Sequence, residues 1–191
     1  MPRIDTPRCV LTLLTPDNAE LLAAYREKNR AHLAPWEPAP EANQSSLGES
    51  CQQAAQTAWQ NYLAGSALRF IGISRSTQCM VAACSFTNIV RGPFQACHLG
   101  YSVDRDYQGQ GLMHEVLQSA ISYMFDSVGL HRIMANHMPT NVRSEHLLRR
   151  LGFEREGYAR AYLKIAGRWE DMVLNALVNQ NFSDLSIRPN L

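Results

Sequence analysis

The sequence has few charged residues, no excess of either sign of charge and no long apolar run. Charged residues make up 18% of the 191 positions, and 18 Lys and Arg nearly balance 17 Asp and Glu. A net charge of +1 lacks the basic excess of most nucleic-acid-binding proteins, so the charge implies no direct nucleic-acid binding. No apolar stretch approaches the roughly 20 residues that span a bilayer, and the N-terminus lacks the apolar segment of a signal peptide. We therefore expect a cytoplasmic protein that does not contact a membrane.

The cysteines are scattered and form no C-x-x-C pair; they are Cys9, Cys51, Cys79, Cys84 and Cys97. This pattern predicts reduced, mostly buried thiols and no zinc cluster, and no metal is expected. Apolar residues make up 46% of the chain, enough for a sizeable core, and the length favours one domain over residues 1–191. Residues 183–191 are expected to form a flexible tail.

The spacing of apolar residues predicts the order strand, two helices, three strands, helix, strand, helix, two strands. Strands are expected at 8–14, 68–74, 80–89, 95–103, 132–138, 154–163 and 168–177, and helices at about 16–29, 46–64, 112–128 and 141–151. The prolines of segment 33–40 exclude a helix there. This order predicts an α/β fold with a mixed sheet of about seven strands, not a strictly alternating doubly wound fold.

The most informative segment joins the strand 95–103 to the helix 112–128 through Gly109 and Gly111. Glycines at such a junction let the chain turn tightly and point consecutive backbone N–H groups at one spot. Together with the positive end of the helix dipole, these donors suit a pyrophosphate, although a tight turn without a ligand is the alternative. The segment is not a P-loop, because no Lys-Ser or Lys-Thr follows the glycines. It does not fit the Rossmann fingerprint either, because His114 occupies the third glycine position.

The run Gln108-Gly109-Gln110-Gly111-Leu112-Met113 resembles the Q/R-x-x-G-x-G/A pyrophosphate loop of the GCN5-related N-acetyltransferase (GNAT) family. Asn141 and the run Leu151-Gly152-Phe153 resemble downstream landmarks of the same family. Met113 departs from the pattern, since Gly or Ala is usual there, and this departure is typical of the branch that acetylates ribosomal-protein N-termini. Blocks at 29–38, 86–92, 99–102 and 131–136 are also similar to that branch, so the resemblance covers about residues 6–177.

The resemblance implies the GNAT fold, a mixed and mostly antiparallel sheet that is splayed between the strands before and after the glycine-loop helix. It also implies direct transfer of an acetyl group from acetyl-CoA to the N-terminal alanine of a ribosomal protein, in a ternary complex. Ribosome association and the oligomeric state are left open. The residues implied to hold acetyl-CoA are Tyr101, Ser102 and Val103 of the strand, Gln108, Gly109, Gln110, Gly111, Leu112, Met113 and His114 of the loop, and Asn141.

The resemblance also implies an acid and a base. In relatives that acetylate ribosomal proteins, a serine matching Ser144 is placed to protonate the CoA sulfur; a serine that caps the helix is the alternative. Related enzymes carry a base Glu where this chain has Asn136 and an acid Tyr where it has Leu148, so neither assignment carries over. Many members have a Glu where this chain has His98, whose imidazole, with a pKa of about 6.5, is our predicted base. A structural strand histidine is the alternative, because an N-terminal amine with a pKa of about 8 does not require a strong base.

Trp36 and Glu37 are the predicted substrate contacts in the proline-rich segment. The carboxylate would attract the ammonium group of an incoming N-terminus, and the indole would line the entrance; the alternative is a surface loop whose Trp fills the core. Two other functions remain open. An acetyltransferase of a small amine, such as a polyamine or antibiotic, would be favoured by an acidic cluster. A non-catalytic CoA-binding or ribosome-assembly protein would be favoured by the replaced acid and base residues.

Overall fold

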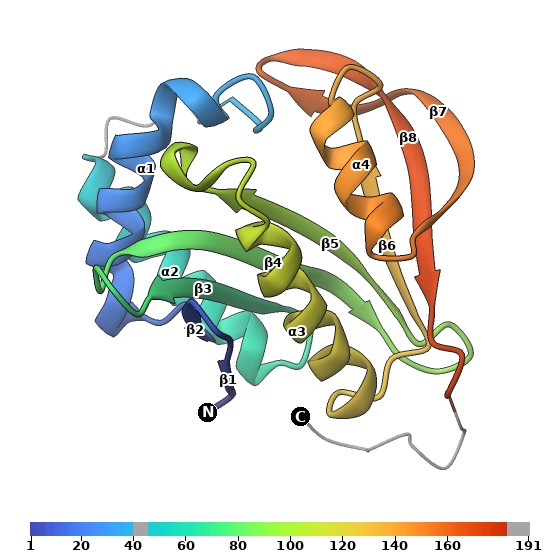
Figure 1. The fold of residues 1–191 in the computed structure, drawn as a ribbon, viewed down its shortest axis with the longest axis horizontal. Coiled ribbons are helices and arrows are strands. Elements are labelled where there is room, and N and C mark those ends of the chain that lie inside the picture. Colours follow the sequence, from blue (N-terminus) through green and yellow to red (C-terminus); the bar gives the residue numbers. More distant parts are fainter. Residues whose placement is uncertain (40–45, 183–191) are drawn as a thin grey trace.

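The computed structural model describes residues 1–39 and 46–182, and eight of its strands form one sheet (Figure 1). The strand order is β1-β2-β3-β4-β5-β6-β8-β7. Every neighbouring pair is antiparallel except β5 and β6, which run parallel. The strands are β1 Arg3–Asp5, β2 Cys9–Leu13, β3 Leu68–Ser74, β4 Met80–Val90, β5 Ala96–Val103, β6 Arg132–His137, β7 Glu154–Ile165 and β8 Arg168–Val178. The predicted mixed, mostly antiparallel α/β fold is confirmed.

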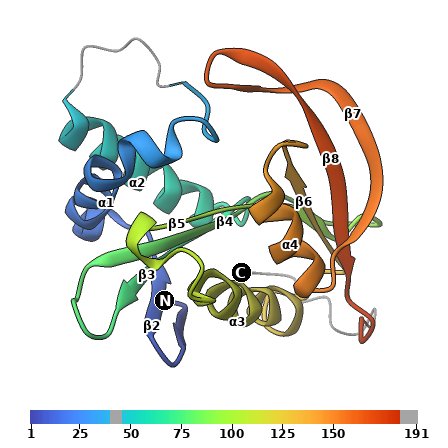
Figure 2. The ribbon, with the colours of Figure 1, turned by 45° about the horizontal axis from the view of Figure 1, so that its top comes forward.

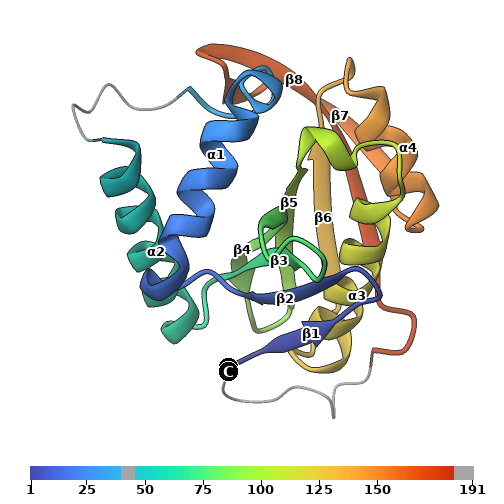
Figure 3. The same cartoon turned by 60° about the vertical axis from the view of Figure 1, so that its left-hand side comes forward.

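The α-helices cover both faces of the sheet. They are α1 Ala19–Leu33, α2 Leu47–Leu63, α3 Leu112–Asp126 and α4 Val142–Arg150. Figure 3 shows α1 and α2 on one face and α3 and α4 on the other. The buried side chains separate accordingly: residues of α1 and α2 pack with Ile71 and Met80, whereas α3 packs over the opposite face. We call the first the α1 face and the second the α4 face.

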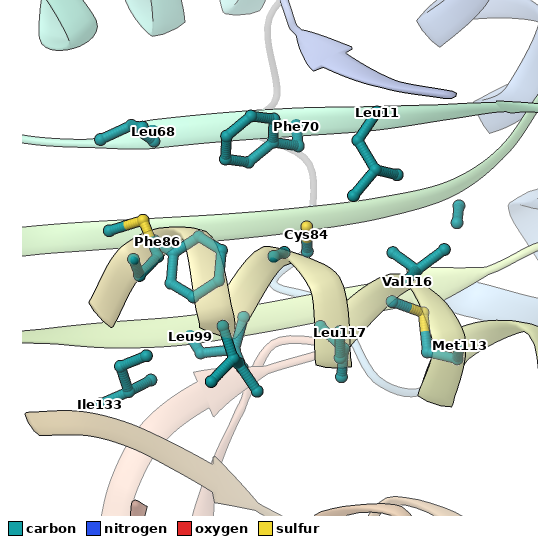
Figure 4. Close-up of a cluster of buried hydrophobic side chains, with 14 of the residues drawn as sticks. Leu11, Leu68, Phe70, Cys84, Phe86, Leu99, Met113, Val116, Leu117 and Ile133 are labelled. Carbon is teal, nitrogen blue, oxygen red and sulfur yellow. The ribbon is translucent and has the colours of Figure 1, made fainter. Parts of the chain in front are cut away.

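The larger core lies between α3 and the central strands (Figure 4). Val116 and Leu117 of α3 are fully buried against a layer that includes Phe70 and Phe86. Full burial of one such side chain is worth about 1.5–3 kcal/mol. The apolar stripe predicted from the helical spacing therefore faces the sheet, and it fixes the N-terminus of α3 next to the end of β5.

Strands β5 and β6 separate along their length (Figure 2). Their pairing covers three positions and ends where His98 meets Met134, whereas β4 stays paired with β5 as far as Val103. Residues 99–103 therefore have a paired strand on one edge and, within the described chain, none on the other. The amide of Asp104 donates to Val81 O of β4 at 2.8 Å, so the alternation of a strand turns the backbone groups of Tyr101 toward the open edge. The implied splay is present.

The elements differ from the expected ones in two places. The sheet has eight strands where about seven were expected, because Arg3–Asp5 pairs with β2, and three residues are too few to show a periodic pattern. Helix α1 continues past Asn29 to Leu33, because this extra turn buries the Leu33 side chain. The chain leaves the helix there, as the prolines require. Positions 40–45, and the tail expected at 183–191, lie outside the described residues.

All five cysteines are free, and only Cys79 is exposed, as the sequence predicted. Burial raises the pKa of the Cys9 thiol to about 11 and those of the Cys84 and Cys97 thiols to about 12. These three thiols therefore stay protonated at neutral pH and are poor nucleophiles. In the described part of the chain, no helix has the length and apolar character needed to cross a bilayer.

Candidate functional site

The glycine loop has the backbone geometry that its sequence predicts. Gly109 and Gly111 have φ angles of +71° and +74°, in the left-handed region that favours glycine, and Gly111 is the N-cap of α3. A Cβ at Gly109 would meet no described atom within 4 Å, so conformation and not crowding requires glycine there. The first helical hydrogen bond runs from Glu115 N to Gly111 O. The three preceding amides, of Leu112, Met113 and His114, therefore have no acceptor within the helix and suit an anion.

Arg8, near the N-terminus, contacts both the glycine loop and the first turn of α3. Its guanidinium donates to Gln110 O at 2.9 Å and forms a 2.7 Å ion pair with Glu115. Burial opposes ionisation of Glu115. The amide and guanidinium of Arg8, together with the Thr6 hydroxyl, outweigh burial and hold the pKa of the Glu115 carboxyl below its usual value. The Arg8–Glu115 ion pair, at the N-terminal end of α3, therefore holds the loop in place.

Asp104 ties the other end of the loop to α1. Its carboxylate is buried, lies 2.8 Å from the ammonium group of Lys28 and accepts from the amide of Asp106 at 2.9 Å. Burial raises the pKa of Asp104, but Lys28, that amide and the Asn29 side chain together hold it below its usual value. Asn29, itself fully buried, also accepts from Arg105 N at 2.9 Å. The end of α1 and the start of the loop thus form one bonded unit.

Gln108 connects both sides of the site. Its side-chain amide lies 2.9 Å from His32 Nε2 of α1, and its carbonyl accepts from Arg143 of α4 at 2.8 Å. Arg143 is therefore a cation next to the glycine loop. Arg132, which could also have met a phosphate, instead pairs with Glu156.

Ser144 lies beside Tyr101 at the open edge of β5. Asn141 is the N-cap of α4, and its side chain accepts from Ser144 N at 3.1 Å, so the Ser144 hydroxyl is not the cap. That hydroxyl is 2.5 Å from the Tyr101 hydroxyl. Burial raises the pKa of Tyr101 to about 12, with Ser144 acting in the opposite direction. The sequence placed the Tyr101 backbone at the cofactor but did not reveal this contact, which depends on how α4 packs.

His98 lies on the other side of the sheet. It is the last residue of β5 that pairs with β6, and alternation puts its side chain on the α1 face, opposite that of Tyr101. Its Nδ1 is buried and has no partner in the described residues, and desolvation lowers the pKa of its imidazole. A ring with a lowered pKa is neutral at pH 7 and able to accept a proton. Asn136 of β6 lies two residues beyond the partner of His98 and shares that face.

The loop after α1 meets the tip of the β7–β8 hairpin. Glu37 O accepts from Ala166 N at 2.9 Å, and Figure 2 shows the two segments close together above the sheet. Trp36 is 39% exposed, so it does not fill the core. Glu170 was not among the predicted residues, although strand register places it on the α1 face with Asn136, near the hairpin tip. Only the pairing of β8, which propensity does not give, could reveal this.

The site therefore has two sides joined by the open edge of β5. On the α4 face are the glycine loop and the Ser144–Tyr101 pair; on the α1 face are His98, the segment with Trp36 and Glu37, and the hairpin tip. An extended ligand could pair with the open edge and place its anionic end at the loop. A second molecule could approach from the α1 face.

Known proteins are similar to this chain in sequence and in fold. The family described as Acetyltransferase (GNAT) domain matches residues 8–154. The "[Ribosomal protein uS5]-alanine N-acetyltransferase" of Escherichia coli K12 is 43% identical over 188 residues, covering 95% of this chain and 93% of the relative.

Solved structures are similar over nearly the whole chain. The ribosomal-protein-S5-alanine acetyltransferase of Vibrio fischeri superposes with a TM-score of 0.89 at 34% identity, covering 96% of this chain and all of the other. Mycobacterium smegmatis RimJ in complex with CoA-disulfide has a TM-score of 0.83 at 23% identity, covering 97% and 90%. The latter likeness concerns the fold alone.

Proposed function

This chain belongs to the GNAT family of acetyltransferases, and from that premise we propose that it acetylates the N-terminal alanine of a ribosomal protein. The observation that carries the proposal is the 43% identity, over 95% of this chain, to the Escherichia coli enzyme named for that reaction on uS5. The fitting location is the cytoplasm, where ribosomal proteins are made, and the acceptor is met there either free or on the ribosome.

Acetyl-CoA, which supplies an activated acetyl thioester, fits the open edge and the loop. The backbone groups of Tyr101 on the open edge offer strand-like pairing to the amides of the CoA arm, and Val103, two residues along, continues that edge, whereas the backbone of Ser102 between them faces β4. The amides at the start of α3, aided by Arg143, suit the pyrophosphate. Leu112 and Met113 contribute only backbone, because their side chains are buried in the core.

Ser144 is the proposed acid for the departing sulfur. A thiolate leaves more readily when a proton is transferred to it in the transition state. The hydroxyl of Ser144 is at the open edge, and Tyr101 is hydrogen-bonded to it. We assign Tyr101 the role of a positioning residue that orients the Ser144 hydroxyl and, as a phenol with a raised pKa, keeps its own proton to share.

His98 is the proposed acceptor of the amine proton. Only a neutral amine attacks a thioester, and an N-terminal ammonium has a pKa of about 8, so a weak base suffices. The neutral His98 ring faces the α1 side, where the acceptor would enter, while Ser144 acts from the α4 side. The proposed base and acid thus lie on opposite faces of the sheet near the point where β5 and β6 separate, with the base on the side from which the amine would approach.

Trp36 and Glu37 are proposed to receive the acceptor N-terminus. The bond between Glu37 O and Ala166 N spans the gap between the two segments, and it limits the space above the α1 face. A small first residue would pass beneath this bridge, whereas a bulky one would have to break it. The Glu37 carboxylate, with Glu170 near the hairpin tip, favours an approaching ammonium group.

Acetyl transfer to peptides that differ only at the first residue tests the proposal. We expect peptides beginning with Ala to react fastest, because steric exclusion discriminates beyond the roughly 1–3 kcal/mol of one methylene. Equal rates for Ala, Leu and Lys at the first position would refute the specificity. Acetylation of polyamines or lysine side chains, with none of any N-terminus, would establish a small-amine enzyme instead.

A further inference from the structure

A cavity of about 340 Å³ lies under α4, apart from the site described above. Its floor holds His137 and Asn175, which are 5% and 7% exposed. His137 Nδ1 is 2.9 Å from Met138 O, so this nitrogen carries a hydrogen and donates it to the carbonyl. Nε2 of the same ring is buried and has no partner in the described residues, and His137 is one of the residues that line the cavity. A buried polar atom without a partner calls for a ligand or water.

The rim of this cavity is charged. Arg149 of α4 and Arg155 of β7 line it, and neither forms an ion pair with any residue that the structure describes. Glu145 also lines the cavity and adds one carboxylate to it. Tyr158 closes one side, with its hydroxyl donated to Asp171 at 2.7 Å. The entrance therefore offers two guanidinium groups and an aromatic ring.

The hairpin extends this surface beyond the cavity. Register puts Tyr158 opposite Val173 and Lys164 opposite Trp169, so these four side chains share the α4 face. Tyr158 is 49% exposed and Trp169 is 65% exposed, which is unusual for such large apolar groups. Lys164 adds a cation to this face, whereas register puts Arg168, opposite Ile165, on the other face. We call this surface, with the cavity under α4, the hairpin surface.

We propose that the hairpin surface binds single-stranded RNA, with one base in the cavity under α4. Exposed aromatic rings stack on bases, and cations track the phosphates. The cavity of about 340 Å³ is large enough for a base, and its lining offers the Tyr158 ring for stacking and the guanidinium groups of Arg149 and Arg155 for the adjoining phosphates. Cations outnumber carboxylates in the lining of the cavity, where Glu145 is accompanied by Arg149 and Arg155. Asp171, at the edge of the same face, is already held by the Tyr158 hydroxyl and Ala161 N.

This inference goes beyond the proposed acetylation, although the two surfaces adjoin. The hairpin tip contacts the acceptor segment through Ala166 and Glu37. RNA held on the hairpin would therefore lie next to an acceptor N-terminus on the neighbouring face. The net charge of +1 hides this surface, because charges elsewhere in the chain balance it.

Fluorescence anisotropy of a labelled single-stranded RNA of about 12 nucleotides tests the proposal on the full chain. The first variant is Arg155→Ala with Lys164→Ala, and its matched control is Arg3→Ala with Arg30→Ala, which removes the same charge elsewhere. We expect the hairpin variant alone to weaken binding, and to reduce the slope of log affinity against log salt by about 1.4. Equal loss in both double variants would overturn the assignment.

Stacking is tested by Trp169→Ala against Phe94→Ala, an aromatic residue exposed to 47% that lies outside the hairpin. Trp169→Ala should weaken RNA binding about tenfold, whereas Trp169→Phe should restore most of it. Peptide acetylation should be unchanged in these variants, so a failure here is distinct from a failure of the proposed reaction.

Two further results would overturn the proposal. One is no RNA binding by the wild type at about 100 µM and low salt, with peptide acetylation intact; binding of an RNA-free ribosomal protein to this face would then assign it to a protein partner. The other concerns the cavity. The ¹³C-labelled ring of His137 should shift on addition of RNA, and an unmoved signal during saturable binding would remove the base from the cavity.

Discussion

The donor side and the acceptor side of this enzyme are built very differently. The glycine loop is held at several points by side chains from distant parts of the chain, including Arg8, Asn29 and Arg143. The acceptor segment with Trp36 and Glu37 has one backbone hydrogen bond to the hairpin tip, and both of its named side chains are exposed. A rigid donor site suits one cosubstrate of fixed shape, whereas a loosely held acceptor site can be altered without disturbing it.

Gly111→Asp attacks the rigid side and should have the largest effect. The substitution forces a side chain into a left-handed conformation and puts a negative charge where the pyrophosphate is expected. Because like-charge contacts cost several kcal/mol, CoA affinity should fall by at least about 100-fold in calorimetry. Gly111→Asn separates the effect of the added charge from the effect of backbone strain, because Asn is uncharged and tolerates this conformation. Gly92→Asp, at another left-handed glycine, is the control. Unchanged affinity in a folded Gly111→Asp protein would remove the phosphate site from the loop.

Ser144→Ala tests the link between the two sides. Loss of the acid should lower kcat by about 100-fold and leave CoA affinity nearly unchanged, because the hydroxyl acts in the transition state. Tyr101→Phe keeps the backbone but removes the hydroxyl that contacts Ser144, so we expect an intermediate loss of about tenfold. Ser122→Ala, an exposed serine of α3, serves as the control. Full turnover in Ser144→Ala would leave that hydroxyl without a chemical role.

His98→Gln should reduce kcat/KM by about tenfold at pH 7, because the amine itself needs little help. The pH profile separates a base from a structural residue. Desolvation lowers the pKa of His98, so the ring gains its proton only below its ordinary value of about 6.5. The wild-type profile should fall below about pH 8, where the acceptor amine protonates, and steepen further where His98 protonates. The variant should keep only the first fall; a profile that steepens equally in both proteins would exclude His98 as the base.

Glu37→Gln should have the smallest effect, and it tests whether the acceptor side can change without affecting the donor side. KM for an acceptor peptide should rise about three- to fivefold, in line with an exposed charge pair, while KM for acetyl-CoA stays unchanged. Glu27→Gln, an exposed carboxylate on α1, controls for general charge. Glu170→Gln shows whether the second carboxylate shares this task. A change in KM for acetyl-CoA would mean that the two sides are not independent.

Much of the donor side could be predicted from sequence, because its signals are local. Gly109 and Gly111 adopt the left-handed conformations that only glycine takes readily, and the stripe of α3 faces the sheet. The role of Asn141 was more specific than its sequence suggests: it caps α4, which leaves Ser144 free to contact Tyr101. That contact joins residues 43 positions apart and depends on packing, so no local pattern shows it.

The acceptor side could not be predicted to the same depth, because strand register decides which side chains face the cleft. The sheet face that Glu170 occupies cannot be decided until the pairing of β8 with β6 and β7 is known. The short strand β1 carries too little pattern to be recognised. The cavity under α4 cannot be recognised in the sequence either, since His137 of β6 and Arg155 of β7 are brought together only by the strand β8 that pairs with both. The assignments of Trp36, Glu37 and His98 remain predictions.

The conformation of the glycine loop depends on contacts with residues that are distant from it in the sequence. Arg8 and Gln110 are 102 positions apart, and Asn29 and Asp104 are 75 apart. A fragment that begins at Leu68 would contain the whole loop motif and none of these contacts. During synthesis, Arg8 and Asn29 are made long before residues 104–115, so their contacts with the loop form only after that later segment has been made. The motif is therefore not portable: transplanted alone onto another strand–helix junction, it would carry its glycines but not its shape.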